Sequence, residues 1–205
     1  MIAQYPTDLH DCSLCEIRES ATQVVPGYGD TNAHIMIIGQ NPGKNEDSQG
    51  KPFVGTSGKW LDRILKSICH TREEVFITNS VKCLTPGNRM PYPEEIEKCA
   101  YWLIQDIKTI NPIIVIPLGA CALQAITCAP PDTRIGDCAG QVMSSALKAL
   151  KDKIIFPLMH PAVLAYNYTR NYIPYCNHVA NLFALLIELG ILEPTVDNWR
   201  DGFRF

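Results

Sequence analysis

The chain has 205 residues, of which 46% are hydrophobic and 19% are charged, and its formal net charge is −3. A chain of this length can bury roughly 70% of the surface of its unfolded form, so it fits one domain and does not need disulfide bonds for stability. The charge excludes a global positive field, so any contact with nucleic acid must be local.

The composition also indicates where the protein works. The sequence has no run of 18 apolar residues, and its start lacks the basic and apolar segments of a secretory signal. We therefore expect a cytoplasmic protein without membrane contact, in which the nine cysteines are mostly reduced. No linker or repeat divides the chain, so we expect one domain over residues 1–205, acting as a monomer, with a C-terminal tail at 191–205.

Apolar runs and helical patterns alternate along the chain. Four β-branched runs without polar alternation are typical of parallel strands covered on both faces. Between them, apolar residues at helical spacing indicate helices. In chain order we predict a strand at 34–39, a helix at 57–69, a strand at 74–79, a helix at 93–110, a strand at 113–118, a helix after Gly119, a strand at 153–158 and a helix at 172–189. This order predicts an α/β fold, a three-layer α/β/α sandwich with a central four-stranded parallel sheet.

Polar residues follow three of the predicted strands. Gly39, Gln40 and Asn41 come at the end of the first strand, Asn79 closes the second, and His160 lies just beyond the fourth. Ligand sites of open parallel sheets lie at the carboxyl ends of the strands. We therefore expect these residues to share a site.

Four cysteines form a pattern of their own. Cys12 and Cys15 are separated by two residues, and Cys83 and Cys99 flank a loop that contains Pro86 and Gly87. Two close thiolates and two more from a loop are typical of a metal centre with four sulfur ligands. A lone pair of this spacing also occurs in zinc knuckles and redox pairs, and buried thiols or a disulfide remain alternatives.

Several motifs together resemble the uracil-DNA glycosylase superfamily, and its iron-sulfur group, often called family 4, matches best. They are G-Q-N-P-G at 39–43, G-K-P-F-V-G at 50–55, I-T-N-S-V-K-C at 77–83, P-G-N-R at 86–89 and H-P-A at 160–162. The resemblance covers about residues 12–186 and implies a glycosylase-like fold. It also implies that Cys12, Cys15, Cys83 and Cys99, two of them within residues 1–20, bind a [4Fe-4S] cluster, with zinc as the alternative occupant.

Excision of uracil requires that the base leave the DNA stack and be read in a pocket. The resemblance implies that Phe53 stacks on the base and that Asn79 hydrogen-bonds its edge. Gly39 and Gln40 are further substrate-binding candidates, because backbone N–H groups around Gln40 could donate to uracil O2. Residue chemistry alone also allows Phe53 to be a core side chain and Asn79 a turn former. His160 would donate to the charge that develops on uracil O2, or else be a histidine bonded to a carbonyl.

The residue that handles the attacking water is ambiguous, because iron-sulfur members generally have Ala or Gly where this chain has Asn41, and an acidic residue where it has Gln40. Asn41 can orient water but cannot take its proton, while Glu46 matches a family carboxylate proposed to act on water. Both are candidates. The glycine at 43 also lacks the bulky side chain with which strict uracil enzymes block thymine.

Contacts to DNA are expected from a few residues around the cleft. We predict phosphate contacts from Lys82 and Arg89, and a loop at Ala162, Val163 and Leu164 that enters the gap left by the base. The sequence thus predicts a monofunctional uracil-DNA glycosylase. The alternatives are a glycosylase for other deaminated bases or mismatches and a catalytically weak DNA-binding iron-sulfur protein of the same fold.

Overall fold

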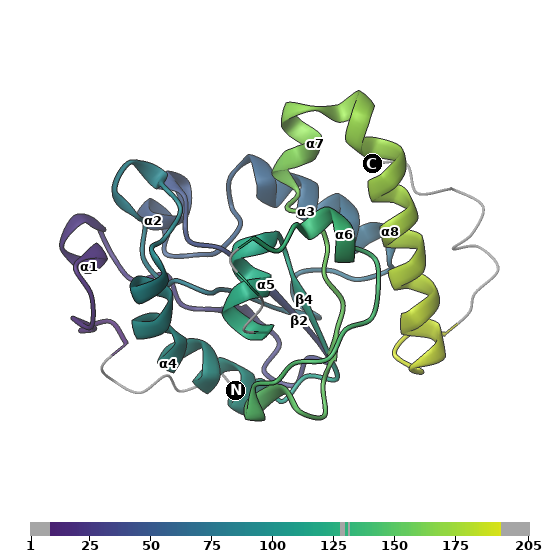
Figure 1. The fold of residues 1–205 in the computed structure, drawn as a ribbon, viewed down its shortest axis with the longest axis horizontal. Coiled ribbons are helices and arrows are strands. Elements are labelled where there is room, and N and C mark those ends of the chain that lie inside the picture. The colour runs from purple at the N-terminus through teal and green to yellow at the C-terminus, as the bar shows by residue number, and fades with distance from the viewer. Residues whose placement is uncertain (1–8, 128–129, 131, 194–205) are drawn as a thin grey trace.

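The computed structural model describes residues 9–127, 130 and 132–193. Its strands are β1 (Tyr28–Gly29), β2 (Ile35–Gly39), β3 (Phe76–Asn79), β4 (Ile114–Pro117) and β5 (Ile154–Ile155). Its α-helices are α1 (Ile17–Ser20), α2 (Lys44–Gln49), α3 (Thr56–Ser67), α4 (Pro93–Ile110), α5 (Ala120–Thr127), α6 (Ile135–Cys138), α7 (Ala162–Tyr166) and α8 (Tyr168–Glu188). Two short 3-10 helices, η1 (Pro86–Asn88) and η2 (Lys148–Leu150), lie in loops (Figure 1).

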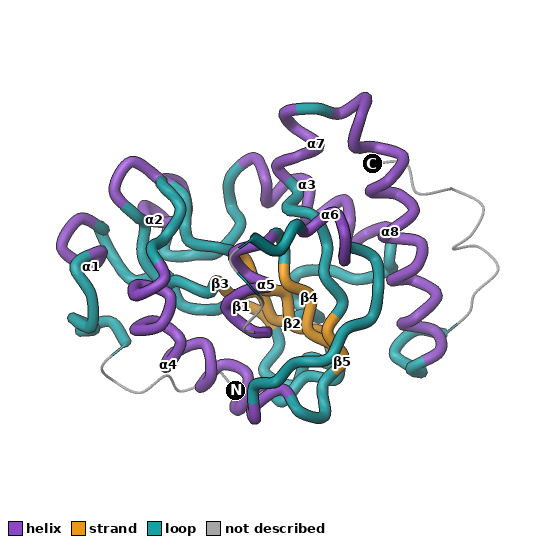
Figure 2. The backbone as a smooth tube through the Cα atoms, viewed as in Figure 1, coloured by secondary structure: helices purple, strands orange, loops and turns teal. Residues whose placement is uncertain are grey.

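The strands form one sheet in the order β1-β3-β2-β4-β5 (Figure 2). The pairs β3–β2, β2–β4 and β4–β5 are parallel, as predicted, and the α/β class is confirmed. The predicted strand count of four is wrong, because the two-residue strand β1 adds to the edge and runs antiparallel to β3. A strand of two residues is too short to show the alternation or length on which a prediction from sequence depends.

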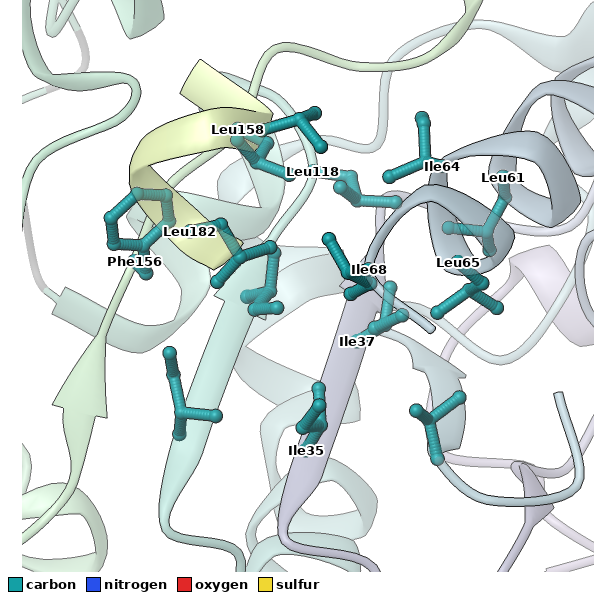
Figure 3. Packing of buried hydrophobic residues seen from close by; sticks show 14 of the residues in the cluster. Ile35, Ile37, Leu61, Ile64, Leu65, Ile68, Leu118, Phe156, Leu158 and Leu182 are labelled. Atoms are coloured by element: carbon teal, nitrogen blue, oxygen red, sulfur yellow. The ribbon is translucent and has the colours of Figure 1, made fainter. Parts of the chain in front are cut away.

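Helices cover both faces of the sheet, so the predicted three layers are present. Alternate residues of a strand point to opposite faces. Ile35 and Ile37 of β2 therefore pack against α3, α7 and α8, while Met36 and Ile38 pack against α4 and α5. Figure 3 shows the first of these two clusters, in which α3 side chains lie beside β2.

A third apolar cluster lies outside the two sheet faces. It joins the N-terminal segment to the start of α4 and contains Leu9, Ile17, Val81 and Trp102 together with the predicted cysteine ligands. The N-terminal segment is thus fastened to the loop that follows β3. Among the helices of the described residues, none is long and apolar enough to cross a membrane.

Candidate active site

A cavity of about 420 Å³ opens at the carboxyl ends of β2 and β3. Its size lies within the usual range of pockets for small ligands. The residues that line it are Gln40, Asn41, Gly43, Lys44, Asn45, Glu46, Phe53, Gly55, Thr56, Ser57, Asn79, Asn88 and His160. Side chains that are far apart in the sequence, and that were predicted to share a site, therefore meet at one cavity.

Asn79 is the most deeply buried polar group of this cavity. Only 3% of the residue is exposed, yet no hydrogen bond to its side-chain amide occurs within the part of the chain that the structure describes. Among the described residues, the one fully buried side-chain nitrogen or oxygen without a partner is His178 Nδ1, so the amide of Asn79 is open to the cavity that it lines. This amide thus has donor and acceptor capacity left for a ligand.

Gly39 allows Asn79 and Phe53 to approach each other. A Cβ atom at position 39 would lie only 2.7 Å from two carbons of the Phe53 ring and would also collide with the Asn79 amide oxygen. Real Cβ contacts are essentially never this short, so a side chain larger than hydrogen would displace one of the two groups. The ring and the amide consequently frame one corner of the cavity.

The conformation of Phe53 is held by its surroundings. Its φ is +54°, in the left-handed region that non-glycine residues rarely adopt, so neighbouring contacts must stabilise it. Arg72 donates hydrogen bonds to the carbonyl oxygens of Pro52, Phe53 and Gly58 and pairs with Asp62. Phe53 belongs to the main core and also lines the cavity, so its two predicted roles are compatible. Sequence analysis missed Arg72, which has no motif around it.

His160 and Phe53 both line the cavity and form a stacked pair, with the ring centroids 6.0 Å apart and the planes 29° from parallel. The backbone N–H of Ala162 donates to its Nδ1 at 3.2 Å. In a neutral ring this places the proton on Nε2, which becomes a donor. Burial lowers the pKa of His160 from 6.5 to about 4, so the ring is neutral at physiological pH.

Gln40 and Asn41 form a small amide network at the rim. Gln40 Nε2 donates to Asn41 Oδ1 at 2.8 Å, and Asn41 Nδ2 donates to the carbonyl of Pro42 at 2.9 Å. Asn41 Nδ2 also lies 3.3 Å from Oδ1 of Asn88, a residue that sequence analysis did not single out. These contacts fix the orientation of the Asn41 amide with its oxygen as an acceptor.

The carboxylate of Glu46 holds two loops together. Its two oxygens accept hydrogen bonds from the N–H groups of Gly43 at 3.1 Å and Gly55 at 2.8 Å. Glu46 lies in the first turn of α2, where a carboxylate also interacts favourably with the helix dipole. The neighbouring Asp47 is buried and accepts from Thr22 and Gln23. Glu46 therefore shapes the cavity wall through structural contacts.

Two residues predicted to contact DNA are buried instead. Lys82 is 1% exposed, and its ammonium group donates to Asp106 at 2.6 Å, Thr78 at 2.5 Å and the Asn79 carbonyl at 2.9 Å. Leu164 is 1% exposed, because residues 162–166 form helix α7 and this side chain enters the core. The predictions of a phosphate contact for Lys82 and of a DNA wedge for Leu164 are wrong.

Arg89, the other predicted phosphate contact, is engaged within the protein. Its guanidinium group binds both carboxylate oxygens of Glu95, at 2.8 and 2.6 Å, and lies 3.8 Å over the ring of Tyr92. The hydrogen bonds from Arg89 lower the pKa of Glu95. Ala162 and Val163 are partly exposed at the start of α7.

The four predicted cysteine ligands line one small cavity with Leu9, Val81 and Trp102. The indole N–H of Trp102 donates to Cys12 at 3.2 Å, and the backbone N–H of Lys82 donates to Cys99 at 3.3 Å.

None of the cysteines in the described ranges forms a disulfide. Over the same ranges, no group of three or more His, Cys, Asp or Glu could hold one metal ion. Burial, and next the neighbouring thiols, raise the pKa of Cys83 to about 12.

Comparison with known proteins finds a consistent set of relatives. The family model described as "Uracil DNA glycosylase superfamily" matches residues 26–186. The type-4 uracil-DNA glycosylase of Archaeoglobus fulgidus is 38% identical over 161 residues, 78% of this chain and 80% of that protein. The type-4 uracil-DNA glycosylase of Saccharolobus solfataricus is 39% identical over 78% of this chain and 75% of that protein. The type-5 uracil-DNA glycosylase of Pyrobaculum aerophilum is 32% identical over about half of each chain.

Proposed function

Because the chain belongs to the uracil-DNA glycosylase superfamily, we propose that it excises uracil from DNA by hydrolysing the N-glycosidic bond, which leaves an abasic site. The observation that carries this proposal is the meeting of Asn79, Phe53 and His160 at one cavity, with the buried amide of Asn79 unpaired among the described residues.

Asn79 reads the base. Its N–H group donates to uracil O4 and its oxygen accepts from uracil N3–H, while cytosine presents a donor and an acceptor in the reverse order. Phe53 supports the base by stacking, which typically contributes ~1–3 kcal/mol per base. Because Gly39 leaves room for both groups, a flipped base can contact ring and amide at the same time.

His160 stabilises the leaving group. Cleavage of the glycosidic bond leaves positive charge on the sugar and negative charge on the uracil, part of it at O2. The Nε2–H of a neutral imidazole donates to that oxygen, and such a donor in a site shielded from water is worth ~3–4 kcal/mol. The Ala162 N–H keeps the proton on Nε2, so the donor is in place before the reaction starts.

Asn41 positions the attacking water. Gln40 occupies one lone pair of Asn41 Oδ1, and the second lone pair accepts a hydrogen bond from water. A sugar cation needs little activation of its nucleophile, so an amide that only orients water is sufficient. Glu46 supports this arrangement indirectly, because its oxygens already bind two backbone N–H groups.

The four cysteines hold a [4Fe-4S] cluster. Their convergence on one cavity with apolar walls supports four thiolate ligands for one metal centre. When bound, the cluster supplies a structural link between the N-terminal segment and the loop after β3. Iron and labile sulfide in equal amounts, with stoichiometric zinc absent, are the expected result for purified protein.

A broader glycosylase is the second candidate. Gly43 lines the cavity without a side chain, so this position presents no group that would exclude the methyl group of thymine. Assays with uracil, hypoxanthine and thymine mismatches compare the two candidates directly.

The main test measures base release. Uracil-containing single strands and duplexes with uracil opposite guanine are incubated with the protein, and free uracil and alkali-labile sites are quantified. We expect uracil release, with strand cleavage only after alkali treatment. Intact uracil DNA in the presence of excess cluster-loaded protein would contradict the proposal.

A further inference from the structure

Four aromatic side chains, two exposed and two half-buried, lie on α3, α7 and α8. We call this group the aromatic surface and define it as Trp60, Tyr166, Tyr168 and Tyr172. Tyr166 is 88% exposed and Tyr168 is 44% exposed. The ring centroids of Trp60 and Tyr168 are 6.0 Å apart, and those of Tyr168 and Tyr172 are 4.7 Å apart. In Figure 1, α7 and the start of α8 project from the body above α3.

Two helices that carry the aromatic surface begin beside the cavity. Helix α7 begins at Ala162, two residues after His160, and ends at Tyr166, a rise of only ~6 Å along the helix axis. Helix α3 begins at Thr56, which lines the cavity, and Trp60 follows one turn later.

This region is also held rigidly in place. The side chain of Leu164 is buried in the main core, and Asn171 Nδ2 donates to the Val163 carbonyl at 3.1 Å. These contacts fix α7 to the body and to α8. Tyr166 is therefore presented on a fixed support, which reduces the entropy that binding would cost.

The charges around the aromatic surface favour an anionic partner, although the whole chain is acidic. Residues 153–187 contain no Asp or Glu, while Arg170 on α8 is exposed. On α3, Lys59 is exposed and Arg63 lies 4.7 Å over the ring of Trp60. The nearby acidic side chain of Asp62 is paired with Arg72.

We propose that the aromatic surface binds unpaired bases of single-stranded DNA beside the nucleotide that occupies the cavity. This proposal deepens the proposed function and rests on it. Aromatic rings with cations between them are typical of single-strand binding, because unpaired bases offer their faces for stacking and the backbone offers phosphates. Bases in a duplex already stack on each other, so duplex DNA gains much less from Tyr166 and Tyr168.

The test measures binding without catalysis. A fluorescein-labelled, uracil-free single strand and the matching duplex are titrated with the parent protein and with Tyr166→Ala, Tyr168→Ala and the double variant. Tyr166→Phe retains the ring and should restore binding. Tyr101→Ala is the matched control, because Tyr101 is a similarly exposed tyrosine (50%) on α4. Thermal unfolding verifies that each variant is folded.

We expect the double variant to bind the single strand at least tenfold more weakly, since stacking contributes ~1–3 kcal/mol per base. Its duplex affinity should change less than about twofold, and Tyr101→Ala should match the parent for both. Unchanged single-strand affinity, or an equal loss for single strand and duplex, overturns the proposal.

Uracil release by the parent is scored separately, so the two proposals fail in different ways. If the parent releases uracil but the tyrosine variants bind single strands normally, only this inference fails. If the tyrosines are required for single-strand binding but the parent releases no uracil, only the proposed function fails.

Discussion

Two buried polar groups at the end of β3 point to opposite sides of the sheet and differ in their partners. On the side of the sheet that α4 covers, Thr78, Lys82 and Asp106 bind one another, with Asp106 on α4 as the acceptor. On the opposite side, Asn79 is almost as deeply buried but has no side-chain hydrogen bond among the described residues. The first group has its partners within the protein and the second does not. We therefore expect the first group to serve stability and, as proposed above, Asn79 to serve base binding.

This difference has a physical basis. A buried charge is tolerated only when it is paired and hydrogen-bonded, so the ammonium of Lys82 requires its three acceptors. A neutral amide that faces an open cavity needs no partner within the protein, so its hydrogen-bonding capacity stays available to a ligand. The predictions below separate loss of stability from loss of activity on the two sides of β3.

The largest effect is expected from Asp106→Ala. This change leaves the ammonium of Lys82 buried without its counter-ion, and we expect the free energy of unfolding to fall by ~3–5 kcal/mol. Urea unfolding measures the loss. The double variant Lys82→Met with Asp106→Leu replaces both charges by apolar groups and should recover most of the stability. If Asp106→Ala is as stable as the parent, Lys82 is not a buried ammonium.

His160→Ala should have the next largest effect, on rate rather than on stability. Removal of the Nε2–H donor is expected to lower the single-turnover rate about 100- to 1000-fold, with DNA affinity nearly intact. His10→Ala is the matched control, because His10 is exposed and lies outside the cavity. Full activity of His160→Ala would remove this residue from the mechanism.

Asn79→Ala is expected to lower the excision rate at least ~100-fold while stability changes little, because the wild-type amide has no hydrogen-bond partner among the described residues. Thermal unfolding and uracil release are measured on the same sample. If Asn79→Ala loses much stability but little activity, Asn79 serves the fold more than base reading. The proposed contrast between the two sides of β3 would then be wrong.

The pH dependence of both the excision rate and the stability should report the burial of His160. Because its pKa is lowered from 6.5 to about 4, the rate should be flat through neutral pH and fall about tenfold per unit below about pH 4. The unfolded chain takes up this proton near pH 6.5 and the folded chain only near pH 4, so stability decreases as pH falls through this window. The acidic limb should disappear in His160→Ala; a limb near pH 6.5 would contradict the neutral, buried ring.

The smallest effects are expected at the rim. Asn41→Asp should preserve or raise the rate, because a carboxylate also orients water and can accept its proton. Glu46→Gln should have a smaller effect than Asn41→Ala, since an amide oxygen still accepts one of the two backbone N–H groups. The reverse ranking would move the role in water positioning from Asn41 to Glu46.

The sequence predicted the elements and the position of the site more successfully than the burial of single side chains. Helix α4 was predicted with the bounds that the structure gives, because Pro93 and the following acidic residues mark its start. The meeting of Asn79 and His160 at one edge follows from parallel topology alone, since strand ends converge there.

Burial of single side chains depended on distant partners and could not be predicted. Lys82 appears to be a surface lysine until Asp106 on α4 is placed behind it. Leu164 was expected in a loop that enters DNA, but helix α7 begins at Ala162 and buries this side chain. The left-handed Phe53 depends on Arg72, which the sequence places nineteen positions away.

The contact between Gly39, Phe53 and Asn79 has a consequence for how damage recognition can be lost. A single added methyl group at position 39 would meet the Asn79 amide oxygen and the Phe53 ring, and so would close the space between them. A protein altered in this way would have to move the ring or the amide, and the pair could then no longer meet a base together. The geometry of base reading therefore also depends on a backbone position that performs no chemistry.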